Sequence, residues 1–171
     1  QGGLRFNNFY SENMCWVSRA ALLTGVYHKT SMVNSTLHAR CVTLPELLRQ
    51  QQYQTRMSGK WHLAGKKSSV YPLDRGFDEY FGIPSSLDTP PYFYIEGNQA
   101  VAPVSDTIAA SSSEGWSPVQ GAFWRAGKVA PGFRHEDVLP RFGEKAVQTI
   151  EQHAEHDPGA PLFLYLALPA P

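Results

Sequence analysis

The chain has no excess of charge of one sign, only two cysteines and no long apolar run, and these scarcities exclude several classes of protein. Its 15 basic and 15 acidic residues cancel to a formal net charge of zero, so no overall field attracts nucleic acid or an anionic membrane. The longest apolar run, Leu162 to Leu168, has the length of a strand and is too short to span a bilayer. We therefore expect no nucleic-acid partner and no membrane association.

The chain has two cysteines, and it begins without an initiator methionine. Cys15 and Cys41 could pair, but two cysteines are too few to indicate a redox compartment. The chain begins at Gln1 without a methionine or a signal-peptide pattern, and it stops at Pro171 directly after a strand pattern. We therefore expect a piece of a longer protein. Its 171 residues and 42% hydrophobic share predict one domain, or one part of a domain, with a real core.

The patterns of helix and strand alternate along the chain. Thr43-Leu44-Pro45-Glu46 is a capping-box sequence and predicts a helix that runs to about Gln52. Residues 53–58 then have the pattern of a strand that leads to Gly59. A second helix is predicted from about residue 139 to 153, with an apolar face made of Leu139, Phe142, Ala146 and Ile150.

The run at 162–168 is almost unbroken in its apolar character, which is typical of a strand covered on both faces. We expect it to be a central strand. Helix, strand, helix and strand in this order predict an α/β fold whose sheet is mainly parallel and sandwiched by helices.

Residues 97–131 have no clear periodicity, and we expect a long excursion over one end of the sheet. Aromatic residues in or near this segment could stack on sugar rings or, with Arg125, hold anionic groups, although local packing is at least as common for such residues. They are Tyr92, Phe93, Tyr94, Trp116, Phe123 and Trp124.

The stretch from Cys15 to Gly25 places a potential nucleophile and a fixed cation at the start of a short helix. Residues 18–23 are mostly good helix formers, and Gly25 stands where a left-handed cap would end the helix. Cys15 is therefore expected just before the helix N-terminus, where free N–H groups favour an anion. Arg19, one turn later, adds a permanent charge with a planar fork of donors. The alternative interpretation is a small buried cysteine beside a surface arginine.

A second block of chemically useful residues is Gly59-Lys60-Trp61-His62-Leu63. It follows the predicted strand at 53–58, so Lys60 and His62 fall at the carboxyl end of that strand, where open α/β sheets place their sites. Lys60 supplies a flexible positive charge, and His62 can exchange protons near neutral pH. By itself, a histidine at a strand end is more often structural.

The two blocks together resemble the two signatures of the type I sulfatases, which are arylsulfatase-like members of the alkaline phosphatase superfamily. The first signature is similar to Cys15-x-x-Ser18-Arg19-x-x-Leu22-Leu23-Thr24-Gly25, and the second to Gly59-Lys60-Trp61-His62. Further similar stretches occur in the same order. They are Arg5-Phe6-x-Asn8, Thr43 to Leu48, Tyr53-x-Thr55, Arg75 to Gly82, Phe163 to Leu166 and Pro169 to Pro171. The resemblance covers nearly the whole chain and is weakest at 97–121.

The resemblance implies a fold and an activity. Residues 1–171 would be a fragment of the N-terminal catalytic domain, with an alkaline-phosphatase-like sheet that is incomplete at both ends. The activity would be hydrolysis of sulfate esters (a sulfuric ester hydrolase), with a sulfated small molecule or glycan as substrate. The family also implies a periplasmic, extracellular or lysosomal location.

The resemblance also implies the site residues and their cofactor. Cys15 would be oxidised to formylglycine by a formylglycine-generating enzyme, and its hydrated aldehyde would be both the nucleophile and a ligand of calcium. Arg19 would stabilise the diol, Lys60 would hold sulfate oxygens, and His62 would assist proton removal. Three cationic groups around a developing oxyanion agree with the charges read from the residues alone.

The chain departs from the family pattern at the position two residues after the cysteine, where Val17 replaces a proline. This difference keeps open a non-catalytic anion- or sulfated-glycan-binding protein that has lost maturation. A phosphoester or phosphonate hydrolase of the same superfamily is the enzymatic alternative. We expect the isolated chain to be inactive, because the family's other metal ligands, its leaving-group histidine and a second lysine lie outside it.

Overall fold

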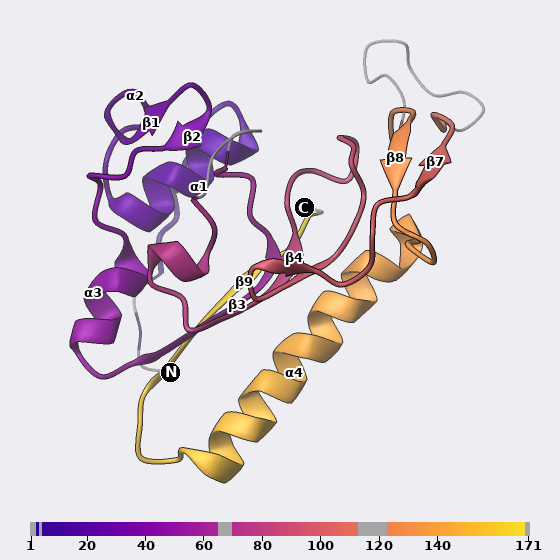
Figure 1. Cartoon of the computed structure of the whole chain (residues 1–171). Helices are drawn as coiled ribbons and strands as arrows, with labels where there is room; N and C mark the ends of the chain where they lie inside the picture. The colour runs from indigo at the N-terminus through magenta and orange to yellow at the C-terminus, as the bar shows by residue number, and fades with distance from the viewer. Residues whose placement is uncertain (1–2, 4, 65–69, 113–122, 170–171) are drawn as a thin grey trace.

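The computed structural model describes residues 3, 5–64, 70–112 and 123–169. Figure 1 shows the course of the chain. The helices are α1 (Cys15–Thr24), α2 (His28–Ser31), α3 (Leu44–Gln50) and α4 (Val138–His156), with 3-10 turns at Leu73–Arg75 and His135–Asp137. The strands are β1 (Met32–Val33), β2 (Thr36–Leu37), β3 (Gln54–Lys60), β4 (Glu79–Ile83), β5 (Ile95–Glu96), β6 (Gln99–Ala100), β7 (Asp106–Ile108), β8 (Gly127–Val129) and β9 (Leu162–Ala167).

The main sheet has five strands in the order β6-β5-β4-β3-β9. Strand β3 pairs in parallel with both β4 and β9, whereas β5 and β6 are added antiparallel beyond β4. Successive residues of β3 face opposite layers: Met57 packs in a cluster with Leu23 of α1, and the Ser58 hydroxyl donates to the Phe142 carbonyl of α4. Helices therefore cover both faces, and Figure 1 shows α4 along one of them. The predicted α/β fold is confirmed, but the described sheet is mixed rather than mainly parallel: β4, β3 and β9 are parallel, whereas β5 and β6 are antiparallel.

The expectation that residues 162–168 form a central strand is wrong for the sheet described here. Strand β9 lies at its edge and pairs only with β3 among the described residues. Its residues from Leu162 to Tyr165 are half-buried, and the Leu166 side chain is 41% exposed. The apolar run predicts a β-strand, but how many strands pair with it depends on the rest of the sheet.

Helix α3 begins with the predicted capping box. The Thr43 side chain accepts the Glu46 N–H, and the Glu46 carboxylate accepts the Thr43 N–H at 2.7 Å. The same Thr43 hydroxyl donates to the Arg75 carbonyl at 2.8 Å, and Gly76 takes a φ of +89° directly against Glu46. The start of α3 is therefore bound to the turn that precedes β4.

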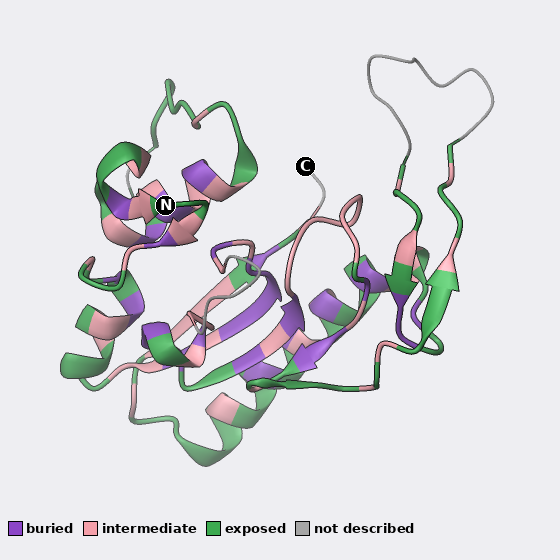
Figure 2. Cartoon of the chain, turned by 45° about the horizontal axis from the view of Figure 1, so that its top comes forward, coloured by how far each residue is buried: buried purple, intermediate pink, exposed green. Residues whose placement is uncertain are grey.

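Helix α4 spans the predicted range, and its buried face agrees with the predicted one at Phe142 and Ala146 but not at its two ends. The residues buried along it are Val138, Phe142, Ala146 and Thr149. The side chains of Leu139 and Ile150, expected on the apolar face, are 45% and 51% exposed. The helix is rotated because Val138 and Phe142 enter a second core with Ile83, Tyr92, Tyr94, Val129 and Phe133. Figure 2 shows the outer side of α4 as exposed.

The expected excursion at 97–131 contains β6 and the antiparallel pair of β7 and β8. It is joined to the rest of the chain at Tyr92, whose N–H donates to the Lys128 carbonyl and whose carbonyl accepts the Ala130 N–H. Trp116 lies outside the described residues. The described part of the chain contains no helix with the length and apolar character of a membrane span.

Candidate functional site

Lys60 and His62 lie at the carboxyl edge of the sheet because β3 ends at Lys60 and the chain turns there. The Trp61 N–H donates to the Ile83 carbonyl, and the His62 N–H donates to the Pro84 carbonyl, so this segment stays beside the end of β4. His62 has a φ of +57°, a conformation that a non-glycine residue seldom adopts and that clusters at functional sites. This turn directs the imidazole toward α1.

Cys15 is the first residue of α1, one position further into the helix than expected, with Met14 as the N-cap. Gly25 forms the predicted left-handed cap, with φ +66° and its N–H bonded to the Ala21 carbonyl. The Cys15 Sγ accepts a hydrogen bond from Lys60 Nζ at 3.0 Å and lies 3.4 Å from His62 Nδ1. The structure therefore brings the two predicted blocks together at one exposed thiol.

Lys60 is a buried cation that forms no ion pair with any carboxylate the structure describes. Its side chain is 3% exposed, and besides the thiol its Nζ donates to Ser86 Oγ at 3.0 Å. In the described part of the chain, no carboxylate forms an ion pair with it. Because burying a charge is costly unless it is paired, this arrangement favours an anionic ligand at the ammonium group.

Arg19 lies one turn after Cys15 but makes no hydrogen bond with it among the described contacts. Its Nη1 donates to the Lys60 carbonyl at 2.8 Å and to the Tyr165 hydroxyl at 3.3 Å, and its Nη2 donates to the Leu168 carbonyl at 3.3 Å. These bonds hold α1 against the ends of β3 and β9. The Arg19 Nε is buried without a hydrogen-bond partner in the described chain, so one donor is left for an acceptor from outside.

The surroundings of His62 keep its ring neutral, so the expectation of three cationic groups is wrong and the charged groups of the site are Lys60 and Arg19. Burial lowers the pKa of His62 to about 4, with further lowering by the Lys60 and Arg19 charges, while Asp88 opposes the shift. A neutral imidazole can accept a proton at neutral pH, as a general base must.

Ser86 and Asp88 belong to this site and were missed from the sequence. Both lie in the loop after β4, which is parallel to β3, so this loop must reach the same edge of the sheet. The apolar residues at 80–83 followed by Pro84 were the available signal for a strand and its end. Arg125, from the excursion, supports this loop with an ion pair of 3.2 Å to Asp88.

Two cavities adjoin the thiol and the imidazole. One of about 720 Å³ is lined by Cys15 and Arg19, with Glu12, Tyr27 and Tyr165 among its other walls. The second, of about 740 Å³, is lined by His62 and by aromatic side chains that include Trp16. Both volumes lie within the usual range of small-molecule sites.

The described residues do not by themselves fit a calcium ion. They contain no group of three or more histidine, cysteine, aspartate or glutamate side chains that could hold a metal. Calcium normally takes about 6–8 oxygen ligands. Cys15 and Cys41, which could have paired, are both free thiols.

The comparisons with known proteins agree with the two signatures. The family model described as Sulfatase matches residues 1–171. The chain is 43% identical over 190 residues to arylsulfatase G of Mus musculus, in a match that covers 97% of this chain and 34% of the relative. The chain therefore spans about a third of that curated relative's length.

Solved structures show the same fold. A structure described for the metabolism of multiple glycosaminoglycans by Bacteroides thetaiotaomicron matches with a TM-score of 0.68 and 22% identity, over 91% of this chain and 40% of the other. Another, in complex with its substrate D-glucosamine-2-N,6-O-disulfate, matches with a TM-score of 0.59 and 22% identity, over 98% of this chain and 27% of the other. With the whole-chain family match and the two signatures meeting at Cys15, the chain belongs to the sulfatase family.

Proposed function

We propose that the centre at Cys15 hydrolyses sulfate esters in the full-length protein, and that residues 1–171 are part of its N-terminal catalytic domain. The buried Lys60 carries this proposal, because its ammonium group has no acidic partner in the described chain and points at the Cys15 sulfur. A sulfate group placed there would supply the missing negative charge. A thiol alone would not explain why a lysine is buried beside it.

The nucleophile in this proposal is a formylglycine made from Cys15. When formed, its hydrated aldehyde would carry two hydroxyl groups. The oxygen of one would attack sulfur while the bond between sulfur and the ester oxygen breaks, and the alcohol would leave with a proton. Deprotonation of the second hydroxyl would then restore the aldehyde, break the bond between carbon and the sulfated oxygen, and release sulfate. The thiol sulfur marks the place of those oxygens, so Lys60 Nζ and Ser86 Oγ would bind the transferred group and His62 would accept the proton. The unpartnered Arg19 Nε would donate to one diol oxygen.

Calcium stays a prediction without a site in the described residues. Of the residues here, only the oxygen at position 15 would be a ligand, so no step in this mechanism depends on the metal. Binding of the sulfate group is assigned to Lys60 and Ser86, and its charge is balanced by the Lys60 ammonium and Arg19 guanidinium groups.

The substrate class, the maturation partner and the cellular location are proposed from the relatives. A structural neighbour is bound to a sulfated glucosamine, which supports a sulfated sugar as the substrate class. A formylglycine-generating enzyme would be the partner during maturation. An extracellular, periplasmic or lysosomal location is proposed on the same family grounds.

Val17 supports the second candidate, a non-catalytic anion-binding sulfatase relative. It occupies the third position of α1, is 2% exposed, and stands where the resembled signature has proline. The Ser18 N–H makes the first hydrogen bond of the helix, to Met14 at 3.0 Å, so a proline at 17 would remove no helical bond. The hydrogen bonds of the helix therefore do not require valine here.

Two measurements on the full-length protein test the proposed function. The mass of the tryptic peptide that contains Cys15 is expected to show the aldehyde, which is lighter than the thiol. The rate on 4-nitrophenyl sulfate should exceed the rate on 4-nitrophenyl phosphate and should vanish in Cys15→Ala. An unmodified thiol with sulfate binding but no turnover would support the non-catalytic candidate, and faster phosphate hydrolysis would favour a phosphoesterase.

A further inference from the structure

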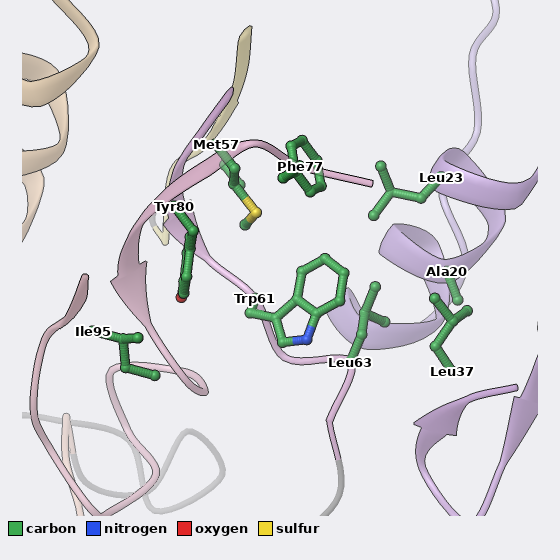
Figure 3. Close-up of a cluster of buried hydrophobic side chains, with 10 residues drawn as sticks. Ala20, Leu23, Leu37, Met57, Trp61, Leu63, Phe77, Tyr80 and Ile95 are labelled. Carbon is green, nitrogen blue, oxygen red and sulfur yellow. The ribbon is translucent and has the colours of Figure 1, made fainter. Parts of the chain in front are cut away.

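The cavity beside His62 has a rigid aromatic floor. Trp61, Tyr80 and Ile95 are at most 4% exposed and belong to the first core cluster, where Figure 3 shows them with Met57 and Leu63. The Trp61 Nε1 donates to the Val70 carbonyl at 2.9 Å, and the Tyr80 hydroxyl donates to the Ile83 carbonyl at 3.0 Å. These bonds fix both rings, so the floor of the cavity is preorganised.

The walls add aromatic side chains from segments far apart in the sequence. Trp16 comes from the first turn of α1, Tyr71 from the segment before β4, and Phe93 from the segment before β5; all three are half-buried. Asn34 and Ser35, in the turn between β1 and β2, add exposed polar side chains at the rim. Flat apolar faces bordered by polar groups suit a sugar ring, which has apolar C–H faces and hydroxyl edges.

The cavity beside Cys15 is less suited to that role. It carries the charged side chains of Arg19 and Glu12. Its aromatic wall includes Phe9, Tyr10 and Tyr27, whose side chains are 78%, 87% and 73% exposed. Side chains held so loosely would have to be ordered on binding, which costs conformational entropy.

We propose that the cavity between Trp16, Tyr71 and Phe93 binds the sugar ring of the sulfate ester, and that Trp16 determines specificity for that ring. This inference rests on the proposed sulfatase function. His62 lines this cavity and its Nδ1 lies 3.4 Å from Cys15 Sγ, the atom to which Lys60 Nζ is hydrogen-bonded, so one ligand can reach both places. The sulfate binds at the Lys60 ammonium group, and the alcohol part lies on the aromatic floor.

The test compares kinetics of variants from the two cavities in the full-length protein. Trp16→Ala and Phe93→Ala are expected to raise KM for glucosamine 6-O-sulfate roughly tenfold, because each removes an aromatic contact. The kcat per formylglycine and the inhibition constant of inorganic sulfate should stay unchanged, since both depend on the anion site. Trp16→Phe should recover most of the lost affinity, and Tyr27→Ala, in the other cavity, is the matched control.

An unchanged KM in Trp16→Ala and Phe93→Ala would overturn the inference, as would a rise confined to Tyr27→Ala. A rise for 4-nitrophenyl sulfate without one for the sugar ester would also overturn it, since the occupant would then be an aryl ring. If the protein hydrolyses no sulfate ester, the proposed function fails and the cavity is still tested. Glucosamine should then quench tryptophan fluorescence, with a half-saturating concentration roughly tenfold higher in Trp16→Ala than in the unsubstituted protein, and equal half-saturating concentrations would reject the site.

Discussion

Replacing Lys60 with methionine separates a catalytic charge from a structural one. The Lys60 side chain is 3% exposed and donates to Cys15 Sγ and Ser86 Oγ, each at 3.0 Å. Methionine keeps the apolar stem and removes the ammonium group. Loss of one well-placed donor to a developing oxyanion costs about 10²–10³ in kcat, so turnover of 4-nitrophenyl sulfate should fall by that factor.

The stability of Lys60→Met should be close to that of the unsubstituted protein. Desolvation of a buried ion costs several kcal/mol, and this cost disappears with the charge. Two hydrogen bonds from a charged donor are lost, each worth roughly 1.5–3 kcal/mol. The two effects are of similar size and opposite sign, so the melting temperature of the full-length protein should remain within a few degrees of the unmodified value.

Arg19→Met is the matched control, because it removes a neighbouring cation that is bonded differently. Its guanidinium donates to the Lys60 carbonyl, the Tyr165 hydroxyl and the Leu168 carbonyl. Without it these acceptors lose their partner, so the melting temperature should fall together with kcat. Differential scanning calorimetry and initial rates measure both quantities. A Lys60→Met protein that keeps its turnover, or that melts as early as Arg19→Met, would refute the assignment of Lys60 to charge alone.

Three further outcomes are expected. Val17→Pro should raise the fraction of formylglycine at position 15, because proline favours the extended conformation in which the signature is recognised. The fraction is measured from the mass of the peptide, and full conversion in the unsubstituted protein would contradict this prediction. Since the pKa of His62 is about 4 when folded and near 6.5 when unfolded, the unfolded chain takes up a proton as pH falls from about 6.5 toward 4. Stability should therefore decrease in that range in chemical unfolding, and less so in His62→Gln. Gly82→Ala would place a Cβ against the Gly59 carbonyl oxygen and should lower the free energy of unfolding in the same assay. Gly143→Ala would place its Cβ in open space on α4 and should raise the free energy of unfolding by roughly 1 kcal/mol, because alanine has the higher helix propensity.

The elements that were predicted well are those whose signals are local. The capping box at Thr43 and Glu46 concerns neighbouring residues, and both of its hydrogen bonds are present. Gly25 likewise ends α1 through its own backbone conformation. Lys60 and His62 could be expected at the carboxyl edge of the sheet from the strand pattern that precedes them, whereas their meeting with Cys15 was implied by the family resemblance.

The elements that were predicted poorly depend on distant parts of the chain. Whether the run at 162–167 is central or at the edge is decided by which strands pair with it, and the sequence of the run does not contain that information. The rotation of α4 is set by the second core, which the helix shares with Tyr94 and Phe133. Ser86 was missed because β4 was not identified as a strand, so the loop after it could not be placed at the carboxyl edge of the sheet.

The carbonyl and the ammonium group of Lys60 fix the site from two sides. Its Nζ bonds to Cys15, and its carbonyl accepts from Arg19, which lies one turn later on α1. Helix α1 is thus tied to the end of β3 at two points, which sets both its rotation and its distance from the strand. The carbonyl bond does not depend on the side chain at position 60, so it should survive in Lys60→Met. This is the structural reason why the positive charge at that position can be removed while the nucleophile stays in place.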